Sequence, residues 1–102
     1  MTTLAAIPKT SPVQSVTVSG DSLTIELTDG RSISVPLAWY PRLFHGSAAE
    51  RGNYELIGDG EGIHWPDLDE DISAENLIFG WPSGESQESF ARWLEGRAAV
   101  GG

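Results

Sequence analysis

The sequence contains no cysteine, and only 6 of its 102 residues are lysine or arginine. Without cysteine the chain forms no disulfide bond, carries no thiolate nucleophile and provides no cysteine ligand for zinc. The 15 aspartate and glutamate residues give a formal net charge of −9. Because a surface of that sign repels phosphate groups, we expect neither a nucleic acid nor a membrane as the primary partner.

Long apolar runs and targeting signals are missing as well. No run approaches the roughly 18–20 apolar residues that a membrane-spanning helix needs. The segment from Met1 to Pro12 has no basic stretch followed by an apolar one, and Thr2 stands where myristoylation requires glycine. We therefore expect a cytoplasmic protein.

The length and composition predict one small globular domain. Hydrophobic residues make up 39% of the chain and charged residues 21%, values typical of a soluble globular protein with one modest core. We expect a flexible arm over residues 1–12, a single α+β domain over residues 13–80, and a linker with a C-terminal helix over residues 81–102. That helix either packs on the domain or lies at an interface, for example in a homodimer.

The first third of the chain predicts a three-stranded antiparallel meander. Residues 13–18 are rich in β-branched side chains, and apolar residues alternate with polar ones over residues 23–28. Asp29-Gly30 is a strong hairpin signal, and residues 31–35 suit the returning strand. Pro36 ends that strand, because proline donates no hydrogen bond to a sheet.

The middle of the chain predicts short elements joined by turns. Residues 37–44 are dense in aromatic side chains, and Pro41 suits the first turn of a short helix. Ser47, with Glu50 three residues later, forms a capping box for a helix near residues 48–53. Residues 54–57 and 63–65 predict a short hairpin around a glycine-rich turn.

Two helices are expected toward the C-terminus. Ser73 suits the N-cap of a short helix that Gly80 would end in the left-handed conformation. Phe90, Trp93 and Leu94 recur at helical spacing, which predicts an amphipathic helix over residues 86–98. The fold class is α+β: an N-terminal meander, an irregular aromatic-rich middle with short helices and a short hairpin, and a C-terminal amphipathic helix.

Several segments follow one another in an order and spacing that resemble a known family. They are Asp29-Gly30-Arg31, Val35 to Leu43, Gly62 to Pro66, Asp69 to Ser73, and Leu77 to Gly80. Over roughly residues 13–80 the chain resembles the bacterial family catalogued as domain of unknown function 2442. The resemblance implies a small α+β protein with no established activity. It also implies a gene arrangement similar to toxin–antitoxin pairs, and some relatives are fused to a helix-turn-helix domain.

The negative charge is concentrated in the second half of the chain. Residues 1–50 carry 4 acidic and 3 basic side chains, a net charge of −1, whereas residues 51–102 carry 11 and 3, a net charge of −8. These carboxylates either cap turns and helices and are otherwise solvated, or they form a binding face for a basic partner. Seven of them lie in one stretch that has no lysine or arginine: Asp59, Glu61, Asp67, Asp69, Glu70, Asp71 and Glu75.

A second candidate feature is a set of aromatic and charged residues in the segments that carry the resemblance. If the fold brings these segments together, Arg42 is placed to pair with a carboxylate of residues 69–71 through its planar guanidinium. One interpretation is an aromatic cluster with a buried ion pair that fixes the loops. The other is a recognition surface with Arg42 and His64 as its polar anchors. The set comprises Trp39, Tyr40, Arg42, His64, Trp65, Asp69, Glu70 and Asp71.

Metal binding has less support in the sequence. The run Asp67–Asp71 has the spacing of the first ligands of a calcium loop, but Ile72 replaces the glycine and Ile78 replaces the bidentate glutamate of such a loop. His64 with the Asp67–Asp71 carboxylates would suit a metal-assisted hydrolase only if a second histidine joined them. The turn over residues 58–62 lacks the spacing of a phosphate-binding loop, so we expect neither a cofactor nor a bound metal.

The sequence therefore favours a non-enzymatic protein-binding or regulatory module. An antitoxin-like role with a basic protein partner is the leading hypothesis, and no catalytic residue is assigned. The alternatives are the metal-assisted hydrolase and a DNA-associated regulator, although the chain has neither a basic stripe nor a recognisable recognition helix.

Overall fold

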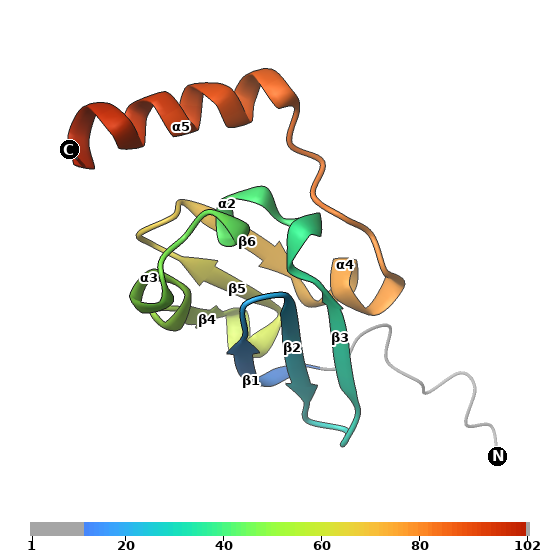
Figure 1. The fold of residues 1–102 in the computed structure, drawn as a ribbon. Helices are drawn as coiled ribbons and strands as arrows, with labels where there is room; N and C mark the ends of the chain where they lie inside the picture. The colour runs from blue at the N-terminus through green and yellow to red at the C-terminus, as the bar shows by residue number, and fades with distance from the viewer. Residues whose placement is uncertain (1–11, 102) are drawn as a thin grey trace, which may run out of the picture.

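Two small antiparallel sheets form the centre of the computed structural model, which describes residues 12–101 (Figure 1). The first sheet has the order β1 (Val13–Val18), β2 (Ser22–Leu27) and β3 (Ser32–Pro36), so the predicted meander is confirmed. Except for Pro12, the expected arm over residues 1–12 lies outside the described residues.

The alternation of side chains explains how the first sheet buries one face. Leu23, Ile25 and Leu27 of β2 are almost completely buried, and Val35 of β3 lies opposite Leu23 on the same side. Glu26, between two of these buried residues, is exposed. A period of two places successive side chains on opposite faces, and the apolar set therefore faces the core.

Short helical segments follow the first sheet. They are a 3₁₀ turn η1 (Leu37–Trp39), α2 (Pro41–Phe44) and α3 (Ala48–Gly52). Pro41 occupies the first turn of α2, as predicted. At the start of α3, the Ser47 hydroxyl accepts a hydrogen bond from the Glu50 backbone N–H, and the Glu50 carboxylate accepts one from the Ser47 backbone N–H. The predicted capping box is therefore present.

A second sheet is larger than the predicted hairpin. Its order is β4 (Glu55–Ile57), β5 (Gly62–Trp65) and β6 (Glu70–Ser73), with the turn η2 (Gly58–Gly60) between β4 and β5. The sequence predicts carboxylates that cap a turn or a helix before Ser73, and no strand; of the four residues of β6, only Ile72 is apolar. In the structure Ile72 lies opposite Ile63, and both side chains are buried. The apolar partner on β5 thus stabilises a strand whose own sequence is polar.

The two C-terminal helices form where expected. In α4 (Ala74–Phe79) the Ser73 hydroxyl accepts a hydrogen bond from the Asn76 backbone N–H, and Gly80 ends the helix with φ of 77°. The last helix, α5 (Gln87–Gly101), extends to Gly101, beyond the predicted end at residue 98. Within residues 12–101 no helix has both the length and the apolar character needed to cross a membrane.

One apolar core joins the two sheets and the short helices. Its largest fully buried side chains include Trp65 of β5, Tyr40 of the η1–α2 junction and Leu68 of the loop before β6. Gly60 lies close to β1, because a Cβ atom on Gly60 would be 2.6 Å from the carbonyl oxygen of Val13. The turn of the second sheet therefore packs directly on the backbone of the first.

The helix α5 lies across the α2 side of the molecule (Figure 1). Its contacts with the domain are aromatic and ionic: the Phe90 ring centroid lies 5.2 Å from that of His45, and Arg97 Nη2 donates to Glu50 Oε1 at 3.0 Å. The guanidinium carbons of Arg42 and Arg97 lie 5.3 Å and 4.8 Å from the Trp93 ring centroid, within the range of a cation–π contact. A role of residues 81–102 at an interface stays a prediction.

Candidate functional site

Arg42 forms an ion cluster beneath the start of α5. Its Nε atom lies 3.0 Å from Oε1 of Glu85, its Nη2 donates to Oε2 of the same carboxylate, and its Nη1 donates to the backbone carbonyl of Asp69 at 2.8 Å. The Asp69 carboxylate is 3.6 Å away and mostly exposed. The hydrogen bonds between Arg42 and Glu85 raise the pKa of Arg42 and lower that of Glu85. The main partner of Arg42 is thus outside the predicted acidic stretch.

Glu70 lies on the inner face of β6, opposite Trp65. Burial raises the pKa of Glu70 to about 7, although the nearby Arg42 guanidinium opposes that shift. Oε2 of Glu70 is buried and has no hydrogen-bond partner among the described residues. Burial, and secondarily the Glu70 charge, raises the pKa of Tyr40 to about 12, and its hydroxyl donates to the Trp81 carbonyl at 2.7 Å. This cluster ties the linker before α5 to the domain.

The structure separates the predicted aromatic and charged set into two groups. Tyr40 and Trp65 are core residues with exposed fractions of 2% and 0%, and Trp39 packs against that core partly buried. Trp65 donates its indole N–H to the Arg51 carbonyl at 3.0 Å. His64 is the neighbour of Trp65 on β5 and therefore points to the opposite face of the sheet.

His64 belongs to a polar row across the second sheet. It lies directly between Glu55 of β4 and Asp71 of β6 in the strand register. Its Nδ1 atom is hydrogen-bonded to Asp71 Oδ1, and that bond raises the pKa of His64. Ile63, Trp65 and Ile72 are buried on the side of the sheet that faces the core, and the opposite side, which carries His64, therefore faces solvent. We call this side the outer face of the second sheet: Glu55, Ile57, Gly62, His64, Asp71 and Ser73.

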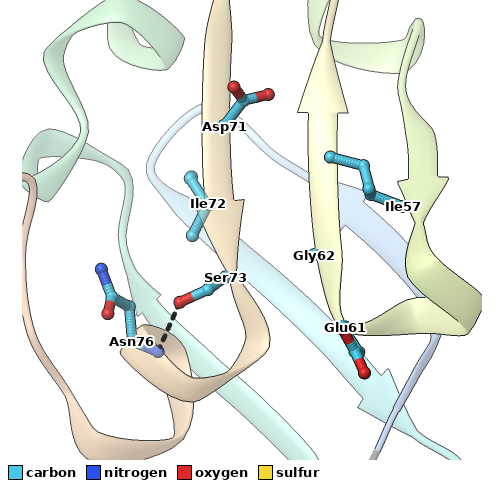
Figure 2. Close-up of a pocket in the computed structure, with 7 residues that line it drawn as sticks. All are labelled: Ile57, Glu61, Gly62, Asp71, Ile72, Ser73 and Asn76. Atoms are coloured by element: carbon cyan, nitrogen blue, oxygen red, sulfur yellow. Dashed lines mark hydrogen bonds between the residues drawn. The ribbon is translucent and has the colours of Figure 1, made fainter.

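The outer face contains a hollow of about 400 Å³ beside Gly62 (Figure 2). Ile57, with an exposed fraction of 45%, extends from β4 over β5 at one side of it. Glu61 and Asp71 lie toward opposite ends, and both are exposed. Ser73 and Asn76 complete the polar lining at the start of α4. The hollow therefore combines an apolar side with carboxylate, hydroxyl and amide groups.

Several carboxylates of the acidic stretch form no ion pair with another described residue. Within residues 12–101, no lysine or arginine forms an ion pair with Asp59, Glu61 or Glu75, and all three are exposed. Asp67 accepts a hydrogen bond from the Asn53 side chain at 2.9 Å. The negative charges of Asp59, Glu61 and Glu75 are therefore not compensated by a neighbouring cation among the described residues.

The donors of the hydrolase alternative are not gathered at one point. Among the described residues, no group of three histidine, aspartate or glutamate side chains is arranged to hold a metal ion. His64 faces Asp71 on the outer face, Glu70 faces the core, and Asp67 is bonded to Asn53. The strand β6 causes this separation, because its alternation sends neighbouring carboxylates to opposite sides.

The sequence does not predict two features of the candidate site. Glu85 is 43 residues from Arg42, and no local pattern marks their pairing. The hollow depends on Gly62 lying beside Ile57 in the β4–β5 register. The sequence predicts a hairpin of residues 54–57 and 63–65, but it places Gly62 in the turn over residues 58–62, whereas the structure places Gly62 in β5.

Comparison with known proteins agrees with this fold. A model of the family described as Protein of unknown function (DUF2442) matches residues 13–83. The chain belongs to this family. The resemblance found in the sequence is thereby confirmed, and Glu85 and α5 lie beyond the DUF2442 match.

Two solved structures resemble the chain. A crystal structure of a protein of unknown function from Rhodospirillum rubrum has a TM-score of 0.63 at 23% identity, covering 76% of this chain and 95% of the other. A solution structure of an uncharacterised protein from Chromobacterium violaceum has a TM-score of 0.61 at 18% identity, covering 79% and 74%. At these identities the likeness shows the shared fold. No functionally curated protein matches the chain.

Proposed function

We propose that this DUF2442 protein is a non-enzymatic protein-binding module that acts in regulation, and that its partner is a basic protein. The partner docks on the outer face of the second sheet. The observation that supports this surface most directly is the row Glu55–His64–Asp71 beside the half-exposed Ile57. Protein interfaces combine an apolar contact with complementary charge, and this face offers both.

Charge complementarity argues for a basic partner. The segment from residue 51 onward carries 11 acidic and 3 basic side chains. Two of those three cations, Arg51 and Arg97, are bonded within the chain to backbone carbonyls and to Glu50. Asp59, Glu61 and Glu75 are exposed and form no ion pair within residues 12–101, so an approaching basic protein meets uncompensated negative charge, which accelerates association and orients the partner.

An antitoxin-like role is the specific form of this proposal. It rests on the gene arrangement that the family resemblance implies, together with the acidic outer face of the second sheet. In that role the protein binds a small basic protein encoded beside it, and the activity under control belongs to that partner. The cytoplasm is the compartment in which such a pair would act.

The test is affinity capture with matched variants. The protein is immobilised, exposed to a lysate of its native host at low and high salt, and the retained proteins are identified by mass spectrometry. We expect a basic protein that wild type and Glu26→Gln retain at low salt, that the double variant Glu55→Gln/Asp71→Asn loses, and that high salt releases. Glu26 is an exposed glutamate on the first sheet and provides the charge control. Retention that is equal in all variants, or no basic protein at all, contradicts the proposal.

A further inference from the structure

The hollow on the outer face of the second sheet lies beside Gly62, the strand residue of this face that has no side chain. Gly62 is flanked in the register by Ile57 on β4 and Ser73 on β6. A Cβ atom on Gly62 would lie 3.4 Å from the Ile72 carbonyl oxygen and 3.9 Å from Ile57 Cδ1, which are ordinary contacts. A larger residue would therefore fit the backbone, and glycine leaves open the space that such a residue would fill (Figure 2).

The walls of this space differ in chemistry. On one side the exposed Ile57 offers an apolar surface to a methylene chain. Around it are acceptors at different positions: the Glu61 and Asp71 carboxylates and the side-chain oxygens of Ser73 and Asn76. One oxygen of Asp71 is bonded to His64, and Glu61 has no hydrogen bond or ion pair among the described residues. An occupant with an apolar stem and several donors at its end matches this arrangement.

We propose that the hollow binds one arginine side chain from the basic partner, with its methylene stem against Ile57 and Gly62 and its charge balanced by Glu61 and Asp71. This inference rests on the proposed function and specifies what the docking surface recognises. Arginine is favoured over lysine because its planar guanidinium has five donors for acceptors at separate positions and is less strongly hydrated than an ammonium group.

Four of the five arginines of this chain are engaged elsewhere, which favours a guanidinium from another protein. Arg42 binds Glu85, Arg97 binds Glu50 and Arg31 binds Asp29. Arg51 donates to the Leu43 and Phe44 carbonyls, and Arg92 is on α5. Within residues 12–101 no arginine pairs with the Glu61 or Asp71 carboxylate, so among the described residues no arginine competes with a partner for these groups.

The test uses a fluorescent arginine–glycine repeat peptide and a lysine–glycine repeat peptide of equal length. Their affinities are measured by anisotropy at low salt for wild type, Gly62→Val and Ser34→Val. Gly62→Val fills the hollow and leaves the net charge unchanged, and Ser34→Val adds the same side chain to the outer side of the first sheet. Gly62→Ala is the milder second variant, and circular dichroism verifies that each variant is folded.

We expect wild type and Ser34→Val to bind the arginine peptide more tightly than the lysine peptide. Gly62→Val should weaken arginine-peptide binding about tenfold and remove the preference for arginine, as expected for loss of a central anchor. Gly62→Ala should have an intermediate effect. An unchanged affinity in folded Gly62→Val, or equal binding of the two peptides by wild type, overturns the arginine pocket. If Glu55→Gln/Asp71→Asn binds both peptides as wild type does, the proposed function fails and the pocket with it, because Asp71 belongs to both. A weakened double variant with an unchanged Gly62→Val overturns the pocket alone.

Discussion

The outer sides of the two sheets have different surfaces although the sheets have the same number of strands. On the first sheet, Thr17, Thr24 and Ser34 lie in one row, and the hydroxyls of Thr24 and Ser34 are 2.6 Å apart. The corresponding row of the second sheet is Glu55, His64 and Asp71, next to the hollow at Gly62. Hydroxyls that are hydrogen-bonded to each other have few groups left to bind a partner protein. Exposed carboxylates beside an exposed isoleucine, in contrast, favour the binding of a partner.

The contrast shows that neighbouring residues of one strand differ in burial, so the position of a carboxylate along its strand decides whether it faces the core or solvent. On β6 the two acidic neighbours have opposite roles, because Glu70 faces the core and Asp71 faces solvent. On β2 the exposed Glu26 is the one carboxylate between buried leucine and isoleucine. The first sheet therefore serves mainly to build the core, and the second sheet presents the acidic surface.

The largest expected effect on stability comes from a substitution at the junction between the two sheets. In Gly60→Ala the new Cβ meets the Val13 carbonyl oxygen at 2.6 Å, at a residue whose φ is 96°. We expect the free energy of unfolding to fall by roughly 2–4 kcal/mol, because a backbone clash adds to the cost of a left-handed alanine. Urea denaturation measures the change. Gly20→Ala is the control, because its Cβ would meet nothing within 4 Å and the effect should be below roughly 0.5 kcal/mol. Equal stability of the two variants would contradict the packing of η2 on β1.

The second prediction separates the two sides of β6. Burial raises the pKa of Glu70 to about 7, above its ordinary value of 4.5, so the folded state holds a proton that the unfolded state has lost between these values. The unfolding free energy should therefore fall as the pH rises from 4.5 through 7. In Glu70→Gln this fall should be largely absent, leaving the variant about 1–3 kcal/mol more stable relative to wild type at pH 8 than at pH 4. Urea titrations across this range measure it.

Asp71→Asn is the comparison for that experiment, since Asp71 faces solvent. The fall in stability between pH 4.5 and 7 should persist in this variant, because Glu70 is still present. If Glu70→Gln keeps the same pH dependence as wild type, the inner position of Glu70 does not control it.

The smallest expected effect concerns the pH dependence of binding. The hydrogen bond with Asp71 raises the pKa of His64, and a protonated imidazole beside the hollow repels a cation. Affinity for the arginine–glycine peptide should thus increase as the pH rises through the His64 pKa, by roughly twofold to fivefold. In His64→Gln the increase should be reduced. Anisotropy measures both, in a Glu70→Gln background, because the pKa of Glu70 is about 7. An increase of equal size with and without His64 would refute this role.

The sequence predicted the first sheet well because its signals are local. Alternation in β2 and the Asp29-Gly30 turn act within a few residues, and the capping pair of Ser47 and Glu50 does so too. The strand β6 was not predicted, because Ile72 is its one buried apolar residue and its partner Ile63 is nine positions earlier in the chain. Its formation depends on tertiary pairing, which local propensity does not report.

The candidate site was predictable only in part for the same reason. The concentration of carboxylates and the presence of His64 among them are properties of the sequence. The division of those carboxylates between inner and outer sides requires the register of β6, and the Arg42–Glu85 pair requires the path of the linker before α5. Pairs so distant in sequence are set by packing and leave no local pattern.

The central claim is that a basic partner docks on the outer face of the second sheet, and mapping amide chemical shifts tests it most directly. The ¹⁵N-labelled protein is titrated with the arginine–glycine peptide at low salt. We predict that the largest shifts fall on β4, β5 and β6, with Gly62 and Asp71 among them, while β1, β2 and β3 remain almost unchanged. Shifts that concentrate on the first sheet or on α5, or that spread evenly over the molecule, would contradict the claim.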